Sequence, residues 1–266
     1  MATLQGRVCV TGASGQAGRA VVRDLLEHGY DVAATDVVAS RDDLEAGMPR
    51  ADLTDYGQAL GALEGAEAVV HLANVPAPGL STPPVTFNSN VTMNFNVFHA
   101  AAGGSVCGGC VGLERDHTRC PVRRRIERGV VHGSRRAGRR AYAPVDEDHY
   151  PLPTTTYALS KVASEVIAGQ IAKWSAIPFV ALRFSNIMVS SDYQEFPAVW
   201  SQAHARKWNL WSYVDARDVA AACRLALEAP QDAVARQPEL RHRGCRHGHE
   251  PPRLRRFSTR SFRMSR

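Results

Sequence analysis

A tyrosine and a lysine four residues apart, in the segment Thr156–Glu165, have the clearest chemical potential in this chain. The segment reads as a helix, on which Tyr157 and Lys161 project from the same face. A lysine ammonium beside a phenol stabilises the phenolate and lowers the phenol pKa toward neutrality. Such a tyrosine can take a proton from a substrate hydroxyl while the carbinol hydride leaves for a nicotinamide. The pair alone is a weak signal, so its meaning depends on the elements around it.

A glycine-rich turn near the N-terminus supplies that context. Residues 7–11 read as a buried strand, and the apolar positions 21, 22, 25 and 26 mark one face of a following helix. A strand, a glycine turn and a helix in this order form a dinucleotide-binding fingerprint, whose helix N-terminus attracts phosphate. The glycines permit the tight turn, the approach of a pyrophosphate and close helix packing. The predicted cofactor contacts in this turn are Gly12, Ser14, Gly15, Gln16 and Gly18.

Acidic residues after the next predicted strands fit the same site. Tyr30–Asp36 reads as a second strand, and the Asp36 carboxylate can accept both ribose hydroxyls of an adenosine while repelling a 2′-phosphate. NAD is therefore favoured over NADP, although Arg41 is close enough to weaken the preference. Ala51–Asp55 is predicted as a short third strand and helix cap that brings Asp52 and Leu53 to the adenine.

Alternating strands and helices predict the fold class. Glu67–Asn74 reads as a fourth buried strand whose end, at Leu72, Ala73 and Asn74, lines the cofactor cleft. This alternation indicates an α/β fold with a Rossmann-like, doubly wound parallel sheet. The length of 266 residues and the 44% hydrophobic content allow one substantial core and a small additional part.

The motifs together resemble the extended short-chain dehydrogenases/reductases, the NAD-dependent epimerase/dehydratase group. The resemblance covers residues 1–102 and 142–229. It rests on Thr11-Gly12-x-x-Gly15-x-x-Gly18, Asp52-Leu53, His71-Leu72-Ala73, Tyr157-x-x-x-Lys161, Leu182-Arg183-Phe184-x-Asn186 and Tyr213-Val214-Asp215-x-x-Asp218-Val219-Ala220.

The resemblance implies particular roles for single residues. Tyr157 would be the catalytic base, Lys161 would hold the nicotinamide ribose, and Asn186 would contact substrate or nicotinamide. Tyr213–Asp215 would form a late strand and cap, with Asp215 and Asp218 structural.

The resemblance also implies the domain organisation and the partners. Residues 1–180 would form the NAD-binding domain, 181–230 a small substrate-binding part, and 231–266 an arginine-rich, disordered tail. The helices at 85–102 and 156–174 would form the four-helix bundle of a homodimer. The substrate would be a small molecule such as a nucleotide sugar or a similar polyol.

Two arginine-rich segments, 103–141 and 231–266, do not fit this pattern. They hold 20 of the 32 basic residues and 6 of the 26 acidic ones, and they contain no lysine. They lie where the family places a fifth buried strand, which ends in a catalytic serine, and a further sheet strand. We expect both segments to be irregular and the chain as written to be a poor enzyme.

Three interpretations of these segments stay open. In a shifted reading frame, GC-rich codons for Ser105–Val111, Gly112–His117 and Ala235–His249 give family-like strand sequences, so frameshifts are our favoured hypothesis. Cys107, Cys110, His117 and Cys120 offer zinc ligands at a spacing that matches no known site, so no metal is predicted. Arginine-rich tails can neutralise nucleic-acid phosphates, but only Phe257 and Phe262 are aromatic in these segments and neither segment shows a nucleic-acid-binding motif, so no nucleic-acid partner is predicted.

The alternative function is a degenerate or regulatory NAD-binding protein that has lost its catalytic serine. Val130–Ser134 faintly resembles the strand that ends in this serine, so Ser134 is a weak candidate for the working hydroxyl. Scattered cysteines and the lack of a signal peptide or an apolar membrane span favour the cytoplasm.

Two groups of residues have expected places in this fold. Four asparagines in the helix at 85–102 are expected mainly at the surface or as caps, although one could order a water in the cleft. They are Asn88, Asn90, Asn94 and Asn96. Trp200, Trp208 and Trp211 are expected mainly in the core near the substrate, with stacking on a sugar or base as the alternative.

Overall fold

The computed structural model describes residues 6–38, 48–104, 106, 108–114, 153, 155–200, 212–229 and 241–244. For residues 108–114, 199–200 and 241–244 only the backbone is described. The predicted features at Arg41, Ser134, Trp208 and Trp211 lie outside this part of the chain, as do the side chain of Trp200 and three of the possible zinc ligands. The fourth, Cys110, is in the part described by its backbone alone.

A six-stranded parallel sheet in the order β2-β1-β3-β4-β5-β8 forms the centre of the fold. Its strands are β1 (Arg7–Thr11), β2 (Val32–Thr35), β3 (Ala66–His71), β4 (Gly108–Glu114), β5 (Phe179–Phe184) and β8 (Arg241–Gly244). A separate two-stranded parallel sheet pairs β6 (Asn186–Met188) with β7 (Tyr213–Asp215). The predicted α/β class with a doubly wound parallel sheet is confirmed.

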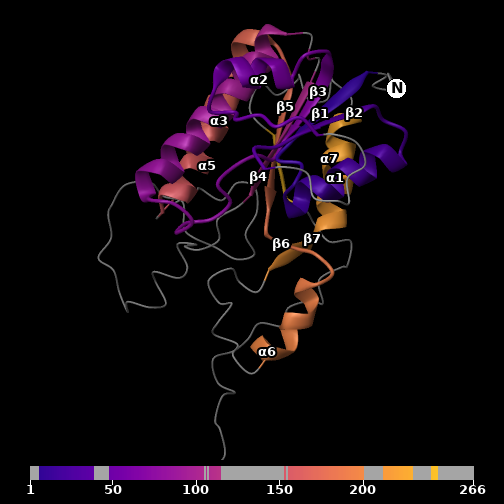
Figure 1. The fold of residues 1–266 in the computed structure, drawn as a ribbon, viewed down its shortest axis with the longest axis vertical. Helices are drawn as coiled ribbons and strands as arrows, with labels where there is room; N and C mark the ends of the chain where they lie inside the picture. Colours follow the sequence, from indigo (N-terminus) through magenta and orange to yellow (C-terminus); the bar gives the residue numbers. More distant parts are fainter. Residues whose placement is uncertain are drawn as a thin grey trace, which may run out of the picture.

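Helices cover both faces of the sheet (Figure 1). One face carries α2 (Tyr56–Ala62), α3 (Pro83–Gly103) and α5 (Thr156–Ser175), and the other carries α1 (Gln16–Glu27) and α7 (Ala216–Leu227). After β6 come the short η2 (Asp192–Glu195) and α6 (Phe196–Trp200). Each face has its own apolar core, around Phe98 and Phe179 on one side and around Leu25 and Phe184 on the other. None of the helices in the described ranges is long and apolar enough to cross a membrane.

The strand predicted at Ala51–Asp55 is wrong, although the helix cap there is confirmed. Only an isolated bridge joins Asp36 to Arg50, and the next residues turn, because the Asp52 carboxylate accepts hydrogen bonds from the backbone and hydroxyl of Thr54. Asp55 then caps α2 by accepting a hydrogen bond from the Gln58 backbone. The expected domain boundary at residue 180 falls inside β5, which is a strand of the central sheet. The helix α7, expected in the substrate-binding part, packs on α1 and so belongs to the helical layer on that face of the sheet.

The expectation that both arginine-rich segments are irregular is wrong where β4 and β8 lie. The first arginine of the segment 103–141 is Arg115, so the residues that form β4 are uncharged apart from Glu114. They can therefore fill the place between β3 and β5. β8 lies at the end of the strand order, where the backbone pairs on one side only and charged residues are tolerated. The frameshift hypothesis stays a prediction for sequencing of the genomic locus.

Three of the four asparagines on α3 are buried, so their expected surface location is wrong. Asn90 and Asn94 are fully buried, and Asn96 is 6% exposed. Buried amides need hydrogen-bond partners, and these find theirs in the loops that follow the strands. Amide residues on an otherwise apolar helix therefore mark contacts with loops.

The glycine turn brings the end of β1 against the start of α1 and the end of β3. Gly12 has a φ of +71°, and a Cβ at this position would lie 2.6 Å from the backbone nitrogen of Ala73. A Cβ on Gly18 would overlap the carbonyl oxygen of Gly12. The turn thus requires glycine at both positions for steric reasons, independently of any ligand.

We predict that Gly18→Ala lowers the free energy of unfolding by about 2 kcal/mol, since backbone atoms must move to admit the methyl group. The matched control is Gly169→Ala in α5, where nothing lies within 4 Å of the added carbon. That substitution should raise stability by up to about 1 kcal/mol through helix propensity. Denaturant unfolding measures both changes, and a neutral Gly18→Ala would contradict the close packing of this turn.

His71, the last residue of β3, is a fully buried imidazole. Its Nδ1 lies 2.6 Å from the Thr11 hydroxyl, and its ring packs edge-on against Phe98. Burial lowers the pKa of His71 to about 3, the nearby Lys161 ammonium adds to this effect, and the side-chain amide of Asn94 opposes it. The ring is therefore neutral in the folded protein at ordinary pH.

The depressed pKa of His71 predicts a specific acid sensitivity. Between the ordinary histidine pKa of 6.5 and about 3, the unfolded chain binds a proton that the folded chain does not, so stability falls as pH falls. From about pH 7.5 to about pH 5 this residue should cost about 2 kcal/mol. Urea unfolding at both pH values should show that His71→Gln removes this part of the loss. Identical pH dependence in parent and variant would show that the ring is not buried in its neutral form.

Candidate cofactor site

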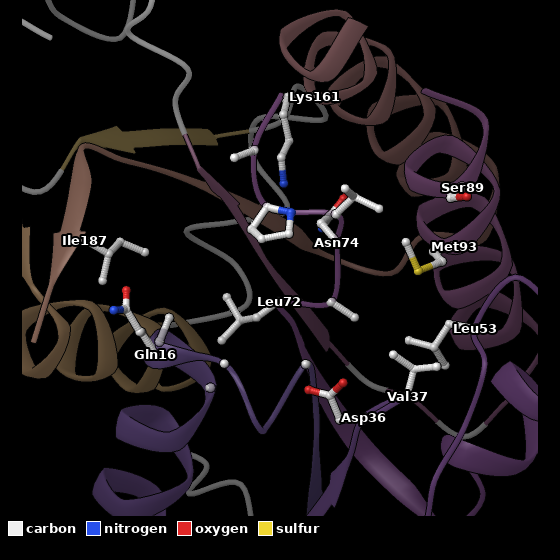
Figure 2. Close-up of a pocket in the computed structure, with 18 of the residues that line it drawn as sticks. Gln16, Asp36, Val37, Leu53, Leu72, Asn74, Ser89, Met93, Lys161 and Ile187 are labelled. Carbon is white, nitrogen blue, oxygen red and sulfur yellow. The ribbon is translucent and has the colours of Figure 1, made fainter. Parts of the chain in front are cut away.

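A cavity of about 740 Å³ opens along the carboxyl ends of the sheet strands. Residues that follow β1, β2, β3 and β5 line it, as do side chains from α3 and α5. Figure 2 shows Asp36 and Lys161 at opposite ends of the view, with Leu72 between them. Ligands of open parallel sheets bind at this edge, because the loops after adjacent strands converge there.

Asp36 forms one end of the cavity. Its two carboxylate oxygens accept hydrogen bonds from the backbone nitrogens of Ser14, at 2.9 Å, and Val38, at 3.2 Å. These bonds orient the carboxylate and join the end of β2 to the glycine turn. The loop at Leu53 and Thr54 forms the adjacent wall, where both carbonyl oxygens accept hydrogen bonds from the Asn96 amide.

The N-terminus of α1 faces the cavity between these walls. Gly15 is the N-cap, no side chain caps the helix, and the first turn holds no acidic residue. The first backbone N–H groups and the positive end of the helix dipole are thus available to an anion. A Cβ on Gly15 would approach only the Gly12 carbonyl oxygen, at 3.2 Å.

Lys161 lines the other end of the cavity from α5. Its side chain is only 7% exposed, and its Nζ atom lies 5.3 Å from the ring centroid of Tyr157. Figure 2 shows the ammonium pointing into the cavity. Tyr157 is 3% exposed and is not part of the cavity lining. The chain from 115 to 152, which precedes α5, lies outside the described residues.

Asparagines of α3 hold the loop after β3. Asn90 accepts a hydrogen bond from the backbone nitrogen of Val75, at 2.7 Å, and donates to the hydroxyl of Ser160 on α5. Asn94 donates to the Asn74 side-chain oxygen at 3.1 Å. The same helix therefore positions the loop at 74–75 and contacts the helix that carries Lys161.

The lining fits a dinucleotide. An oriented carboxylate, an uncapped helix N-terminus and a buried cation succeed one another along the cavity, as the ribose, pyrophosphate and second ribose of such a molecule require. The side-chain nitrogen of Asn74 is a buried donor with no partner among the described residues, and Asn74 lines the cavity. A bound ligand with an acceptor atom would satisfy it.

Most of the predicted site residues come together in this cavity. Those in its lining are Gly12, Gly15, Gln16, Gly18, Asp36, Asp52, Leu53, Leu72, Ala73, Asn74, Lys161 and Asn186. Ser14 is not in the lining but contacts Asp36 through its backbone, and Tyr157 is outside the lining, with its ring centroid 5.3 Å from the Lys161 Nζ atom.

The sequence interpretation missed several lining residues. They are Ala17, Val37, Ala51, Thr54, Val75, Pro76, Ala77, Ser89, Met93, Phe184 and Ile187. Most of them follow a strand or a predicted contact directly, so the rule that loops after parallel strands converge could have found them. Ser89 and Met93 are four residues apart on α3, and their spacing alone marks a helix face without showing what that face meets. Within the described ranges, no three possible metal ligands gather.

Comparison with known proteins agrees with this geometry. The sequence model of the NAD dependent epimerase/dehydratase family matches residues 8–238. Cinnamoyl-CoA reductase 1 of Arabidopsis thaliana is 29% identical over an alignment 266 positions long, gaps included, which covers 89% of this chain and 72% of that protein.

Solved structures share the fold. A UDP-galactose 4-epimerase superposes with a TM-score of 0.66 at 24% identity. The match covers 90% of this chain and 76% of the epimerase chain. The UDP-glucose 4-epimerase of Thermus thermophilus, solved with NAD, superposes with a TM-score of 0.61 at 22% identity. That match covers 90% of this chain and 86% of the epimerase chain. Since the family match spans most of the sequence and the cavity suits a dinucleotide, the chain belongs to the NAD-dependent epimerase/dehydratase family.

Proposed function

We propose that this chain is an NAD-dependent oxidoreductase that moves a hydride between the cofactor and a carbinol or carbonyl carbon of a small molecule. The main support for the proposal is that Asp36 and Lys161 line opposite ends of the same cavity, with the Tyr157 ring next to the Lys161 ammonium. NAD, when bound, supplies the hydride acceptor. The protein must then bind the dinucleotide, place the substrate and move one proton.

We assign particular residues to each of these tasks. Asp36 accepts the hydroxyls of the adenosine ribose, and the backbone at Gly12–Gly18 holds the pyrophosphate. The Lys161 ammonium holds the second ribose and stabilises the phenolate of Tyr157. Tyr157 takes the proton from the substrate hydroxyl, and Asn186 contacts the substrate. A modest movement of Tyr157 toward the cavity is required, since catalytic contacts in ligand-free structures often tighten when substrate binds.

A nucleotide sugar or similar polyol is the first candidate substrate, supported by the nucleotide-sugar epimerases among the structural neighbours. A second candidate is an apolar carbonyl compound. Besides Lys161 and Asn186, the cavity lining includes Val75–Ala77, Phe184 and Ile187, which are apolar. The relationship to a plant cinnamoyl-CoA reductase supports the same candidate.

We also propose a homodimer formed through α3 and α5. These two helices pack on each other, and exposed apolar side chains extend from their outer faces. Val85 and Phe95 on α3 are 50% and 44% exposed, and Leu159, Val166 and Trp174 on α5 are 45%, 59% and 67% exposed. Covering such a row of apolar side chains with a second copy would remove it from water.

Cofactor preference tests the role of Asp36. NAD should bind more tightly than NADP, because a 2′-phosphate would approach this carboxylate. Asp36→Asn keeps the size of the side chain and removes its charge, so the preference should narrow by about 1–2 kcal/mol. Calorimetry with both dinucleotides measures the difference. Equal or tighter NADP binding by the parent protein would exclude the proposed role.

Removal of one hydroxyl tests the catalytic assignment. Tyr157→Phe should slow hydride transfer by about 10²- to 10⁴-fold while NAD affinity stays near that of the parent, because only the proton acceptor is lost. Lys161→Ala should weaken both. The assay follows NADH and product with a panel of UDP-sugars and cinnamoyl-type substrates. Parent-like turnover by Tyr157→Phe would refute the mechanism, and NAD binding without turnover of any panel member would favour a non-catalytic, regulatory protein.

A further inference from the structure

An ion pair with little solvent exposure joins the helix that carries Tyr157 and Lys161 to the central sheet. The Nε and Nη2 atoms of Arg183, on β5, donate to the two carboxylate oxygens of Glu165, on α5, each at 2.8 Å. The side chains are only 11% and 14% exposed. A guanidinium and a carboxylate bound through two parallel hydrogen bonds fix both distance and orientation.

Both partners lie within four residues of a cavity residue in the sequence. Glu165 follows Lys161 by four residues, which is one helical turn or about 6 Å along the axis of α5. Arg183 directly precedes Phe184 and comes three residues before Asn186, and both of these line the cavity. The pair therefore connects the wall that contains Lys161 to the wall that contains Asn186.

Stability alone does not explain a charged pair at this place. Apolar side chains of similar size often hold a helix on a sheet equally well or better, because charges lose hydration when they are buried. Apolar contacts, however, permit a helix to slide or rotate by small amounts, which a two-point clamp resists. The gain from this pair is therefore the precise placement of α5.

We infer that Glu165 and Arg183 are positioning residues, which hold Lys161 in the cavity by clamping α5 to β5. This inference rests on the proposed function of Tyr157 and Lys161. If the clamp is lost, α5 shifts on the sheet, the Lys161 ammonium moves relative to the other cavity walls, and the cofactor loses a contact. Tyr157 and Lys161 move together, because both are on α5.

The test removes both charges of the pair, in the double variant Glu165→Leu/Arg183→Met. The matched control is Asp24→Leu/Arg224→Met, which removes an ion pair between α1 and α7. The Nε–Oδ2 distance of that pair is 2.8 Å, and its side chains are 16% and 19% exposed. Tyr157 ionisation is followed in the protein without cofactor, from tyrosinate absorbance measured against the same protein carrying Tyr157→Phe. Calorimetry with NAD supplies a second measurement that needs no substrate.

In the Glu165/Arg183 double variant, NAD should bind roughly tenfold more weakly, the scale of one lost charged contact. The pH of Tyr157 ionisation should stay near that of the parent, because Tyr157 and Lys161 are on the same helix and move together. The control should match the parent in both measurements. Arg183→Lys keeps the charge but not the two-point geometry and should also weaken NAD binding.

Parent-like NAD affinity in the Glu165/Arg183 variants would overturn the inference, and so would an equal loss of affinity in the control. A shift in Tyr157 ionisation would also overturn it, because it would show a change within α5 rather than in its placement. If the double variant does not fold, Arg183→Lys decides by the same two measurements. The proposed function fails separately, through parent-like turnover by Tyr157→Phe, and that result would leave the NAD affinities of the clamp variants interpretable.

Discussion

The close approach of the glycine turn to the end of β3 is the constraint on which the rest of the structure depends. Gly12 leaves no room for a side chain beside Ala73, and Gly18 leaves none beside the Gly12 carbonyl. Because of this contact, the N-terminus of α1, the Asp36 carboxylate and the loop at 72–77 border one cavity. A wider turn would separate α1 from the sheet edge, and the anion-binding end of the helix would no longer face the same space as the carboxylate.

Polar side chains in the interior then hold the loops around that cavity. Asn90, Asn94 and Asn96 extend from one helix to the segments after two different strands, and each uses its amide in hydrogen bonds to those segments. The fully buried His71 completes this arrangement by contacting Thr11 at the start of the turn. Cavity walls held by hydrogen bonds from buried amides are pre-organised, so little conformational entropy remains to be lost when a ligand binds.

The sequence predicted those elements whose signal lies in neighbouring residues. The glycine turn, the buried strands at β1 and β3, and the helices α3 and α5 were predictable because periodicity and turn chemistry are properties of neighbouring residues. The strand expected at 51–55 was wrong, because the Asp52 side chain bonds to its own loop and competes with strand pairing. β4 was missed because charge counted over all of 103–141 hid an almost uncharged beginning. The burial of the asparagines depends on which loops pack against α3, and that information is not local to the helix.

A crystal structure of the complex with NAD would show directly how the dinucleotide lies in the cavity. The adenosine ribose should lie on Asp36, the pyrophosphate at the N-terminus of α1, and the second ribose within hydrogen-bonding distance of Lys161, with the Tyr157 hydroxyl turned toward the nicotinamide. A dinucleotide bound in the reverse direction, or bound away from the carboxyl edge of the sheet, would contradict the proposed roles of Asp36 and Lys161. A complex in which the Tyr157 hydroxyl stays outside the cavity when both cofactor and substrate are present would contradict the proposed role of Tyr157.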